Sequence, residues 1–281
     1  MNVAPEPEIL HSMLQGVDIP PCPSVLIEVD AELKKDAPNQ REIARLISKD
    51  VSLSGHIIQL ANSPYFSKGN KLVSLVQALN MLGTQQIFNL VVVQLLKKAM
   101  NCTPDEFMEH YWESSALVAR LSAELAKRLR CIRPDIAYTF GLFRDCGIPL
   151  LMKRFPETKQ VLGEASEADE QSFTDIEDRH LGTNHAIVGY FLAKRWRLPS
   201  DVAEAIKLHH DYEMTGRAGY VGTSVKSLIA VGGLAEHIIR LHSKGNGGQE
   251  WLKAAPIACE FLGLSLGAVD DLIEDMCDWL D

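Results

Sequence analysis

Apolar residues recur every three to four positions along nearly the whole chain, the spacing that places side chains on one face of an α-helix. No segment alternates apolar and polar residues over enough positions to predict a β-strand. The interval from Thr84 to Leu96 is apolar on most sides, which is typical of a helix at the centre of a bundle. The pattern therefore predicts an all-α fold, a helical bundle with an N-terminal and a C-terminal helical part.

Short polar segments indicate where the helices begin and where the two parts divide. Residues that cap helix N-termini precede several predicted helices: Asn39, Asp50, Ser74 and Asn184. Pro104 and its polar neighbours interrupt the pattern after the central apolar helix, as a boundary between helical lobes does. We therefore expect an N-terminal helical part over residues 1–104 and a C-terminal helical part over residues 105–281.

An unusual pair of charges ends one of the most apolar predicted helices. The helix predicted over residues 135–145 runs into Arg144 and Asp145, and Gly147 and Pro149 then predict a break. Charged groups in apolar surroundings generally have an ionic partner, a metal or a catalytic task. This stretch is therefore the first candidate for a functional site.

Composition and charge restrict the class of protein. The chain has 28 basic and 37 acidic residues, a formal net charge of −9, which argues against a nucleic-acid partner because such a partner needs a basic face. No run of about 18 apolar residues predicts a membrane span, and the first residues lack the pattern of a signal peptide. The six cysteines are scattered without a Cys-x-x-Cys pair, which is typical of reduced thiols. We therefore expect a globular cytoplasmic protein with no membrane partner.

Several short motifs, in a consistent order, carry a resemblance to a known family. In the N-terminal part they are Pro20-Pro21-Cys22-Pro23-Ser24, Ile47-Ser48-Lys49-Asp50, Leu60-Ala61-Asn62-Ser63-Pro64-Tyr65-Phe66, Ser74-Leu75-Val76-Gln77-Ala78-Leu79 and Leu82-Gly83. In the C-terminal part they are Tyr111-Trp112-Glu113-Ser114-Ser115, the stretch from Gly141 to Leu151, Asn184-His185 with Gly189, Trp196-Arg197-Leu198-Pro199 and His209-His210. From about Pro20 to Leu241 the chain resembles HDOD domains, all-helical relatives of the HD and HD-GYP metal-dependent phosphohydrolases.

The resemblance implies a bacterial signal-transduction or regulatory module that lacks the hydrolase activity of its relatives. It implies signalling proteins as partners, or a small-molecule or nucleotide ligand in the degenerate site. In this reading the C-terminal part is HD-like, and no cofactor is expected.

The resemblance also implies where the metal ligands of the hydrolases fall in this chain. They fall on Ser114, Arg144, Asp145, His185, His209, His210 and Glu236. Arg144 stands where the hydrolases have a histidine, and a guanidinium has no lone pair to offer a metal. We therefore expect a degenerate site at Ser114, Arg144 and Asp145, in which Arg144 pairs with Asp145 and replaces the lost ion.

An enzyme remains the competing interpretation, because a set of metal-capable groups survives. Asp145, His185, His209, His210 and Glu236, with His110 as a possible addition, could hold an iron, manganese, magnesium or nickel ion for phosphoester hydrolysis. Cys146 is a poor nucleophile, because the charge of Asp145 beside it raises the pKa of its thiol.

A second candidate region lies in the N-terminal part. Asn62, Ser63 and Tyr65, together with Arg144, are candidates for contacting a ligand or partner. The same residue types around Pro64 also simply end a helix, so both interpretations of this segment stay open.

Overall fold

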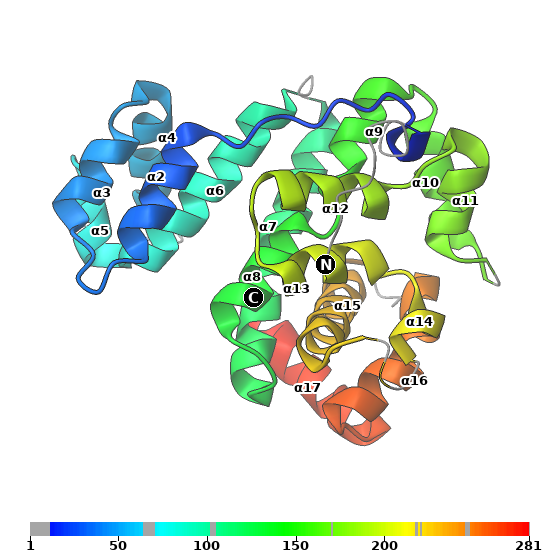
Figure 1. Cartoon of the computed structure of the whole chain (residues 1–281). Coiled ribbons are helices and arrows are strands. Elements are labelled where there is room, and N and C mark those ends of the chain that lie inside the picture. Colours follow the sequence, from blue (N-terminus) through cyan, green and yellow to red (C-terminus); the bar gives the residue numbers. More distant parts are fainter. Residues whose placement is uncertain are drawn as a thin grey trace. The chain divides into compact units, whose positions relative to one another are not determined.

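The computed structural model describes residues 12–63, 71–101, 105–169, 171–216, 219, 221–244 and 248–280. Every regular element in these ranges is a helix, so the all-α prediction is confirmed (Figure 1). The chain forms two compact units, Pro20–Asn101 and Cys102–Asp281, and Met1–Ile19 groups with the second of them. The first unit ends at Asn101, and the described residues 12–19 group with the second unit.

The first unit consists of α2 to α6. Their bounds are Ser24–Leu33, Gln40–Ile47, Val51–Ala61, Leu75–Leu82 and Thr84–Met100. The last of them, α6, packs against α2, α4 and α5. Ile87, Val91 and Leu96 on α6 are fully buried, as expected for a helix that is apolar on most sides.

Side chains just before the helices of this unit accept the hydrogen bonds that the sequence predicts. The side chain of Asn39 accepts from the backbone N–H groups of Arg41 and Glu42, and Asp50 accepts from that of Leu53. Ser74 accepts from the N–H of Gln77. These bonds satisfy backbone donors that the first turn of a helix leaves unpaired, which is why the helices begin at these residues.

The second unit consists of α7 to α17. Their bounds are Glu106–Leu129, Pro134–Phe143, Ile148–Arg154, Thr158–Glu167, Phe173–Leu181, His185–Arg195, Ser200–Leu208, Tyr212–Gly216, Thr223–Lys244, Gly248–Leu262 and Leu266–Leu280. Helix α15 packs against α7, α8, α13, α16 and α17 (Figure 1). The charged pair predicted to end an apolar helix lies at the C-terminal end of α8, inside this bundle.

The break after the charged pair has a different physical basis from the predicted one. Gly147 has a helical φ of −72°, but a Cβ added there would lie 2.1 Å from the carbonyl oxygen of His185. Glycine is therefore needed for close approach of the backbone rather than for a special turn. Pro149 lies in the first turn of α9, where proline starts a helix because its missing N–H has no partner to lose.

A second glycine allows two helices to approach beside the charged pair. A Cβ on Gly232 would lie 2.5 Å from Cε1 of Phe140, so α15 and α8 contact each other at a distance that only glycine permits. The carbonyl oxygen of Gly232 accepts from Nη1 of Arg144 at the end of α8. This oxygen contributes to the candidate site described below.

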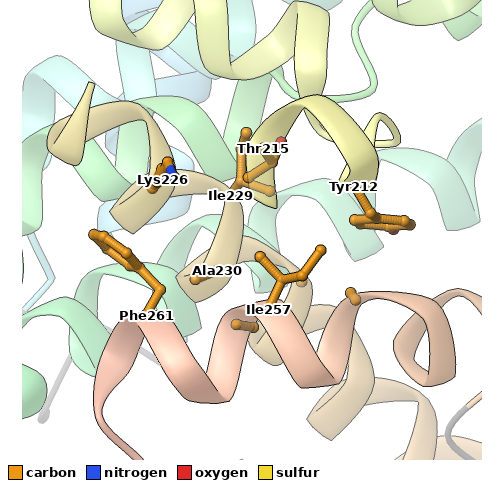
Figure 2. A pocket seen from close by; sticks show the side chains of 10 residues that line it. Tyr212, Thr215, Lys226, Ile229, Ala230, Ile257 and Phe261 are labelled. Carbon is orange, nitrogen blue, oxygen red and sulfur yellow. The ribbon is translucent and has the colours of Figure 1, made fainter. Parts of the chain in front are cut away.

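A small cavity lies where α14, α15 and α16 meet (Figure 2). Its volume is about 20 Å³, and Tyr212, Ile229, Ile257 and Phe261 are among its lining residues. A cavity of this size holds about one water molecule. It is a packing gap between α15 and α16 rather than a pocket for a ligand.

The lengths of the helices bear on whether any of them could cross a bilayer. Within the described ranges, no single helix is both long and apolar enough. Two pairs of consecutive helices, α5 with α6 and α16 with α17, are long and apolar enough when taken together, but each pair is sharply bent at its junction.

Candidate functional site

Arg144 is buried at the C-terminal end of α8, with only 5% of its surface exposed. Its Nε donates to Oδ2 of Asp145 at 3.1 Å, and its Nη2 donates to Oε2 of Glu236 at 2.5 Å. Its Nη1 donates to the carbonyl oxygen of Gly232 at 3.2 Å. Burial opposes the charge, but the two carboxylates outweigh it and raise the pKa of Arg144 above its ordinary value. The ion pair expected from the sequence is present, and Glu236 extends it.

The two carboxylate oxygens of Asp145 have different partners. Oδ2 accepts from Arg144, whereas Oδ1 faces Nε2 of His209 at 3.3 Å and Nε2 of His185 at 3.6 Å. Burial works to raise the pKa of Asp145, but the opposing effects, of which the charge of Arg144 is the largest, outweigh it, so the pKa lies well below its ordinary value. The backbone oxygen of Asp145 accepts from the hydroxyl of Tyr111 at 3.1 Å, which ties the residue to α7.

His185 is the first residue of α12, directly after the helix cap Asn184. Its Nδ1 lies 2.6 Å from Oε2 of Glu177, and its backbone N–H donates to the same oxygen at 3.3 Å. Both residues are almost completely inaccessible to solvent. Burial lowers the pKa of His185, but the carboxylate of Glu177 outweighs that effect, and the pKa is raised.

His209 and His210 follow the last turn of α13, and each has a partner at Nδ1. Nδ1 of His209 lies 2.7 Å from the carbonyl oxygen of Ile206, which can only accept, so this nitrogen carries the proton. Nδ1 of His210 lies 2.7 Å from Oε2 of Glu250. Burial lowers the pKa of both histidines, that of His210 to about 3. Both rings are therefore neutral near pH 7.

Glu250 must accept rather than donate in its contact with His210. Burial works against its charge, but the hydrogen bonds from His210 and Lys253 outweigh it, and the pKa of Glu250 is about 2. An ionised carboxylate has no proton to donate, so Nδ1 of His210 carries the proton. The Nε2 atoms of His209 and His210 then present lone pairs.

These side chains converge on one point. Asp145, His185, His209 and His210 each offer a ligand atom, and the four atoms lie within 4.8 Å of one another. The Nε2 atoms of His185 and His209 are 3.2 Å apart. Three imidazole nitrogens and one carboxylate oxygen are a donor set that suits zinc, iron, nickel or manganese. The residues fit one such ion.

The same residues do not fit a second ion on the other side of Asp145. That side is taken by Arg144, whose guanidinium offers only donors and carries a positive charge that repels a cation. Glu236, expected from the resemblance to be a ligand, pairs with Arg144 and lies outside the four-residue cluster.

Two residues of α7 that were considered for the site are placed elsewhere. His110 is exposed and does not belong to the cluster found among the described residues, and Ser114 is half-buried. The contact from α7 comes instead from Tyr111, one turn before Ser114. The sequence predicted the correct helix but not the side chain that reaches Asp145.

Asn62 lies in the other unit and makes local contacts. Its Nδ2 donates to the carbonyl oxygens of Ile58 and Leu72, and its Oδ1 accepts from the N–H of Leu72 at 2.7 Å. The side chain thus joins the two ends of the segment between α4 and α5. Ser63 is the last described residue before the gap at residues 64–70, and Tyr65 lies outside the described residues.

The carboxylates that orient the histidines were not found from the sequence. Glu177 lies on the apolar face of α11 beside Ile176, and a buried acid in that position is a signal that could have been used. Glu250 lies 40 residues after His210, beyond a glycine-rich segment. No local pattern connects those two residues.

With the helical bundle and the His–Asp cluster established, the class of protein is an HD-like all-helical domain. More specifically, the chain belongs to the HDOD domain family, whose sequence model matches residues 19–212. Glu236 and Glu250 lie beyond the matched span. The family-level comparison therefore leaves out two carboxylates that contact the site.

Solved structures with the same fold come from several bacteria. A candidate phosphohydrolase from Shewanella amazonensis SB2B is 22% identical, with 95% of each chain covered and a TM-score of 0.68. An HDOD domain protein of unknown function from Geobacter sulfurreducens is 26% identical, with 94% of this chain and 97% of that chain covered and a TM-score of 0.63. A candidate signal transduction protein from Marinobacter aquaeolei VT8 is 20% identical, with 93% and 57% covered and a TM-score of 0.72.

A curated relative extends further than this chain. An uncharacterized protein of Treponema pallidum (strain Nichols) is 27% identical over 201 residues, which is 69% of this chain and 38% of that protein. The chain thus spans well under half the length of this relative.

Proposed function

We propose that this chain is a regulatory module of bacterial signal transduction that does not hydrolyse phosphoesters. The observation that carries the proposal is Arg144, buried between Asp145 and Glu236 at 3.1 and 2.5 Å. A permanent cation stands where a two-ion hydrolase needs a ligand with a lone pair. The side of Asp145 that would bridge to a second ion is occupied by a protein group.

The loss of two-ion chemistry follows from what two ions contribute. A pair of ions stabilises both the attacking and the leaving oxygen of a phosphoryl group, and a bound ion lowers the pKa of water to form hydroxide near neutral pH. A guanidinium can stabilise negative charge, but it cannot bind a water as a ligand and acidify it. Ser114 on α7 does not compensate, because it has a neutral hydroxyl where the resemblance expects a histidine.

In this proposal the module acts by binding. Its partners are signalling proteins, or a small-molecule or nucleotide ligand, and a nucleic acid is disfavoured by the net charge of −9. Cys131, Cys146 and Cys259 are free thiols, which supports a reducing compartment such as the cytoplasm. The signal transduction name of the structure from Marinobacter supports the role by analogy of fold alone.

A hydrolysis assay tests the proposal. Protein purified without chelators is incubated with phosphomonoesters, phosphodiesters and cyclic dinucleotides, with added iron, manganese, nickel or magnesium, beside the Asp145→Ala variant. We expect no turnover above that of the variant. Turnover that disappears in Asp145→Ala would overturn the proposal.

A second candidate function is a metal-dependent phosphohydrolase with a single ion. The convergence of Asp145, His185, His209 and His210 favours it. When bound, a divalent ion would polarise a phosphoryl oxygen and acidify a water. The three histidines and Oδ1 of Asp145 would hold it, and the buried imidazoles favour iron, manganese or nickel over magnesium, which prefers oxygen ligands. The same assay separates the two candidates.

A further inference from the structure

Glu250 on α16 is held by three donors that converge on its carboxylate. Oε2 accepts from Nδ1 of His210 at 2.7 Å and from the hydroxyl of Tyr212 at 3.0 Å. Oε1 accepts from Nζ of Lys253 at 2.9 Å. The side chain of Glu250 is only 12% exposed. A carboxylate with this many partners has little freedom to change its orientation.

The anchors of Glu250 connect α16 to two other segments. Lys253 also donates to the carbonyl oxygens of Ala168 and Gln171 at 2.8 Å each, in the connection between α10 and α11. The ring of Tyr212, at the start of α14, lies over α16 (Figure 2). Glu250 is thus positioned by the tertiary structure and not by α16 alone.

The consequence for His210 is a fixed tautomer and a fixed ring plane. Nδ1 of His210 keeps its proton and donates to Glu250, so the lone pair is on Nε2. Phe173 stacks on the ring, with centroids 4.7 Å apart and planes 14° apart. The other two histidines have equivalent partners at Nδ1, namely Glu177 for His185 and the carbonyl of Ile206 for His209.

Three acceptors from three different elements therefore serve one purpose. Each engages Nδ1 of a histidine and leaves Nε2 free to act as a ligand. Nε2 of His185 and Nε2 of His209 lie 3.6 and 3.3 Å from Oδ1 of Asp145, and His210 offers a ligand atom to the same cluster. Acceptors of this kind on the outer nitrogen orient metal-ligating histidines and raise their basicity. A buried imidazole N–H needs an acceptor in any case, but here all three acceptors take the same ring nitrogen and leave the other one available to a ligand.

We propose that Glu250 is a positioning residue that makes His210 a ligand for one divalent transition-metal ion held with Asp145, His185 and His209. The inference rests on the one-ion site set out under the proposed function, and it does not depend on whether the module hydrolyses anything. It assigns a role to α16, which lies outside the span that the family model matches.

The experiment is a Co²⁺ titration of the full chain after dialysis against a chelator. The visible absorption of Co²⁺ reports its ligands, and competition with a chromophoric chelator gives the dissociation constant. We expect Glu250→Ala to weaken binding by between about ten- and one-hundredfold and to change the absorption spectrum. The Co²⁺ affinity of Glu250→Gln should lie between those of wild type and Glu250→Ala, because an amide oxygen can still accept from Nδ1.

Two controls separate positioning from a general effect on the fold. Glu260→Ala alters an exposed acid on the same helix and should leave the affinity and the spectrum unchanged. His210→Ala should weaken binding to the same extent as Glu250→Ala, and the double variant should lose no more than His210→Ala alone. A merely structural role for Glu250 would give additive losses instead.

Each outcome decides the inference. Circular dichroism shows whether Glu250→Ala folds. If it does not, the Co²⁺ affinity of folded Glu250→Gln is compared with that of Glu260→Ala instead. Equal affinities of these two variants would contradict the proposal. Wild-type affinity and spectrum in Glu250→Ala would do the same. A wild-type chain that binds no Co²⁺ would end the inference and leave the non-hydrolytic regulatory module intact.

Discussion

Nη2 of Arg144 lies 2.5 Å from Oε2 of Glu236, although 92 positions separate the two residues in the chain. Nη1 of the same guanidinium contacts the carbonyl oxygen of Gly232, one turn earlier on α15. Arg144 therefore joins the end of α8 to two successive turns of α15. The arginine that occupies one side of Asp145 is at the same time a cross-link of the bundle.

Replacing Arg144 with alanine should destabilise the protein by about 2–4 kcal/mol, measured as the free energy of unfolding in urea. Removal of the guanidinium leaves Asp145 and Glu236 without their common partner. Because these side chains are 27% and 32% exposed, water relieves part of the cost, and the loss should be smaller than for a fully buried pair. Arg133→Ala, which removes an exposed pair with Asp135, should have no measurable effect. Equal unfolding midpoints for the two variants would contradict the cross-link.

The helices were predictable because their signals are local. Asn39, Asp50 and Asn184 accept hydrogen bonds from the first turns of α3, α4 and α12. The fully buried Ile87 and Leu96 belong to the helix that is apolar on most sides. In each case, periodicity and cap chemistry lie within a few residues of each other, and tertiary contacts only reinforce them.

The site was predictable only in part, because its geometry depends on residues far apart in the chain. The side chains that resemble family motifs, Asp145, His185 and His209, were named from the sequence and do come together. The acceptors Glu177 and Glu250 were missed, since no pattern relates them to the histidines they orient. Tyr111 was missed because the resemblance directed attention to Ser114 on the same helix.

Gly147→Ala should destabilise the protein by about 3 kcal/mol or more, because the new Cβ would lie 2.1 Å from the carbonyl oxygen of His185. A backbone atom cannot move aside as a flexible side chain can, so α9 or the start of α12 must shift. Gly163→Ala is the matched control, since nothing lies within 4 Å of its added Cβ. In that exposed helical position alanine should leave the free energy of unfolding unchanged or raise it by about 0.5–1 kcal/mol. Thermal unfolding of both variants provides the comparison, and similar melting temperatures would argue against the close approach.

The free energy of unfolding of the Ser122→Ala variant should exceed that of the Ser115→Ala variant by about 1 kcal/mol. Both serines are buried on α7, so their helix propensities and surroundings are similar. The hydroxyl of Ser122 has no hydrogen-bond partner among the described residues, whereas that of Ser115 donates to the carbonyl oxygen of Tyr111 at 2.8 Å. Removal of an unpaired buried hydroxyl relieves a desolvation cost, and removal of a paired one does not. Urea unfolding of the two variants tests this order, and the reverse order would indicate an additional partner for Ser122.

His210 should make the protein sensitive to mild acid. Burial lowers the pKa of His210 in the folded state to about 3, against roughly 6.5 in an unfolded chain. Between these values the unfolded state binds the proton and the folded state does not, so stability falls as the pH falls from about 6.5 to 3. The expected contribution of this residue is about 1.4 kcal/mol per pH unit.

The window from pH 6 to 5 isolates this contribution, because carboxylates with lowered pKa values such as Asp145 and Glu250 stay ionised there. His209 acts in the same direction as His210, since burial lowers its pKa too. The pKa of His185 is raised, so in the folded state it is already protonated at the top of this window and stabilises the fold at acid pH. The slope of stability against pH therefore has to be compared between variants rather than interpreted in wild type alone.

His210→Asn supplies that comparison, because an asparagine amide can still donate to Glu250 but does not titrate. Its unfolding free energy in urea should fall by about 1 kcal/mol less than that of wild type between pH 6 and pH 5. His180→Asn alters a histidine on α11 whose side chain is 41% exposed, and it should keep the wild-type slope. If His210→Asn kept that slope as well, His210 would be protonated in the folded state, and the neutral ring that presents Nε2 to the cluster would be wrong.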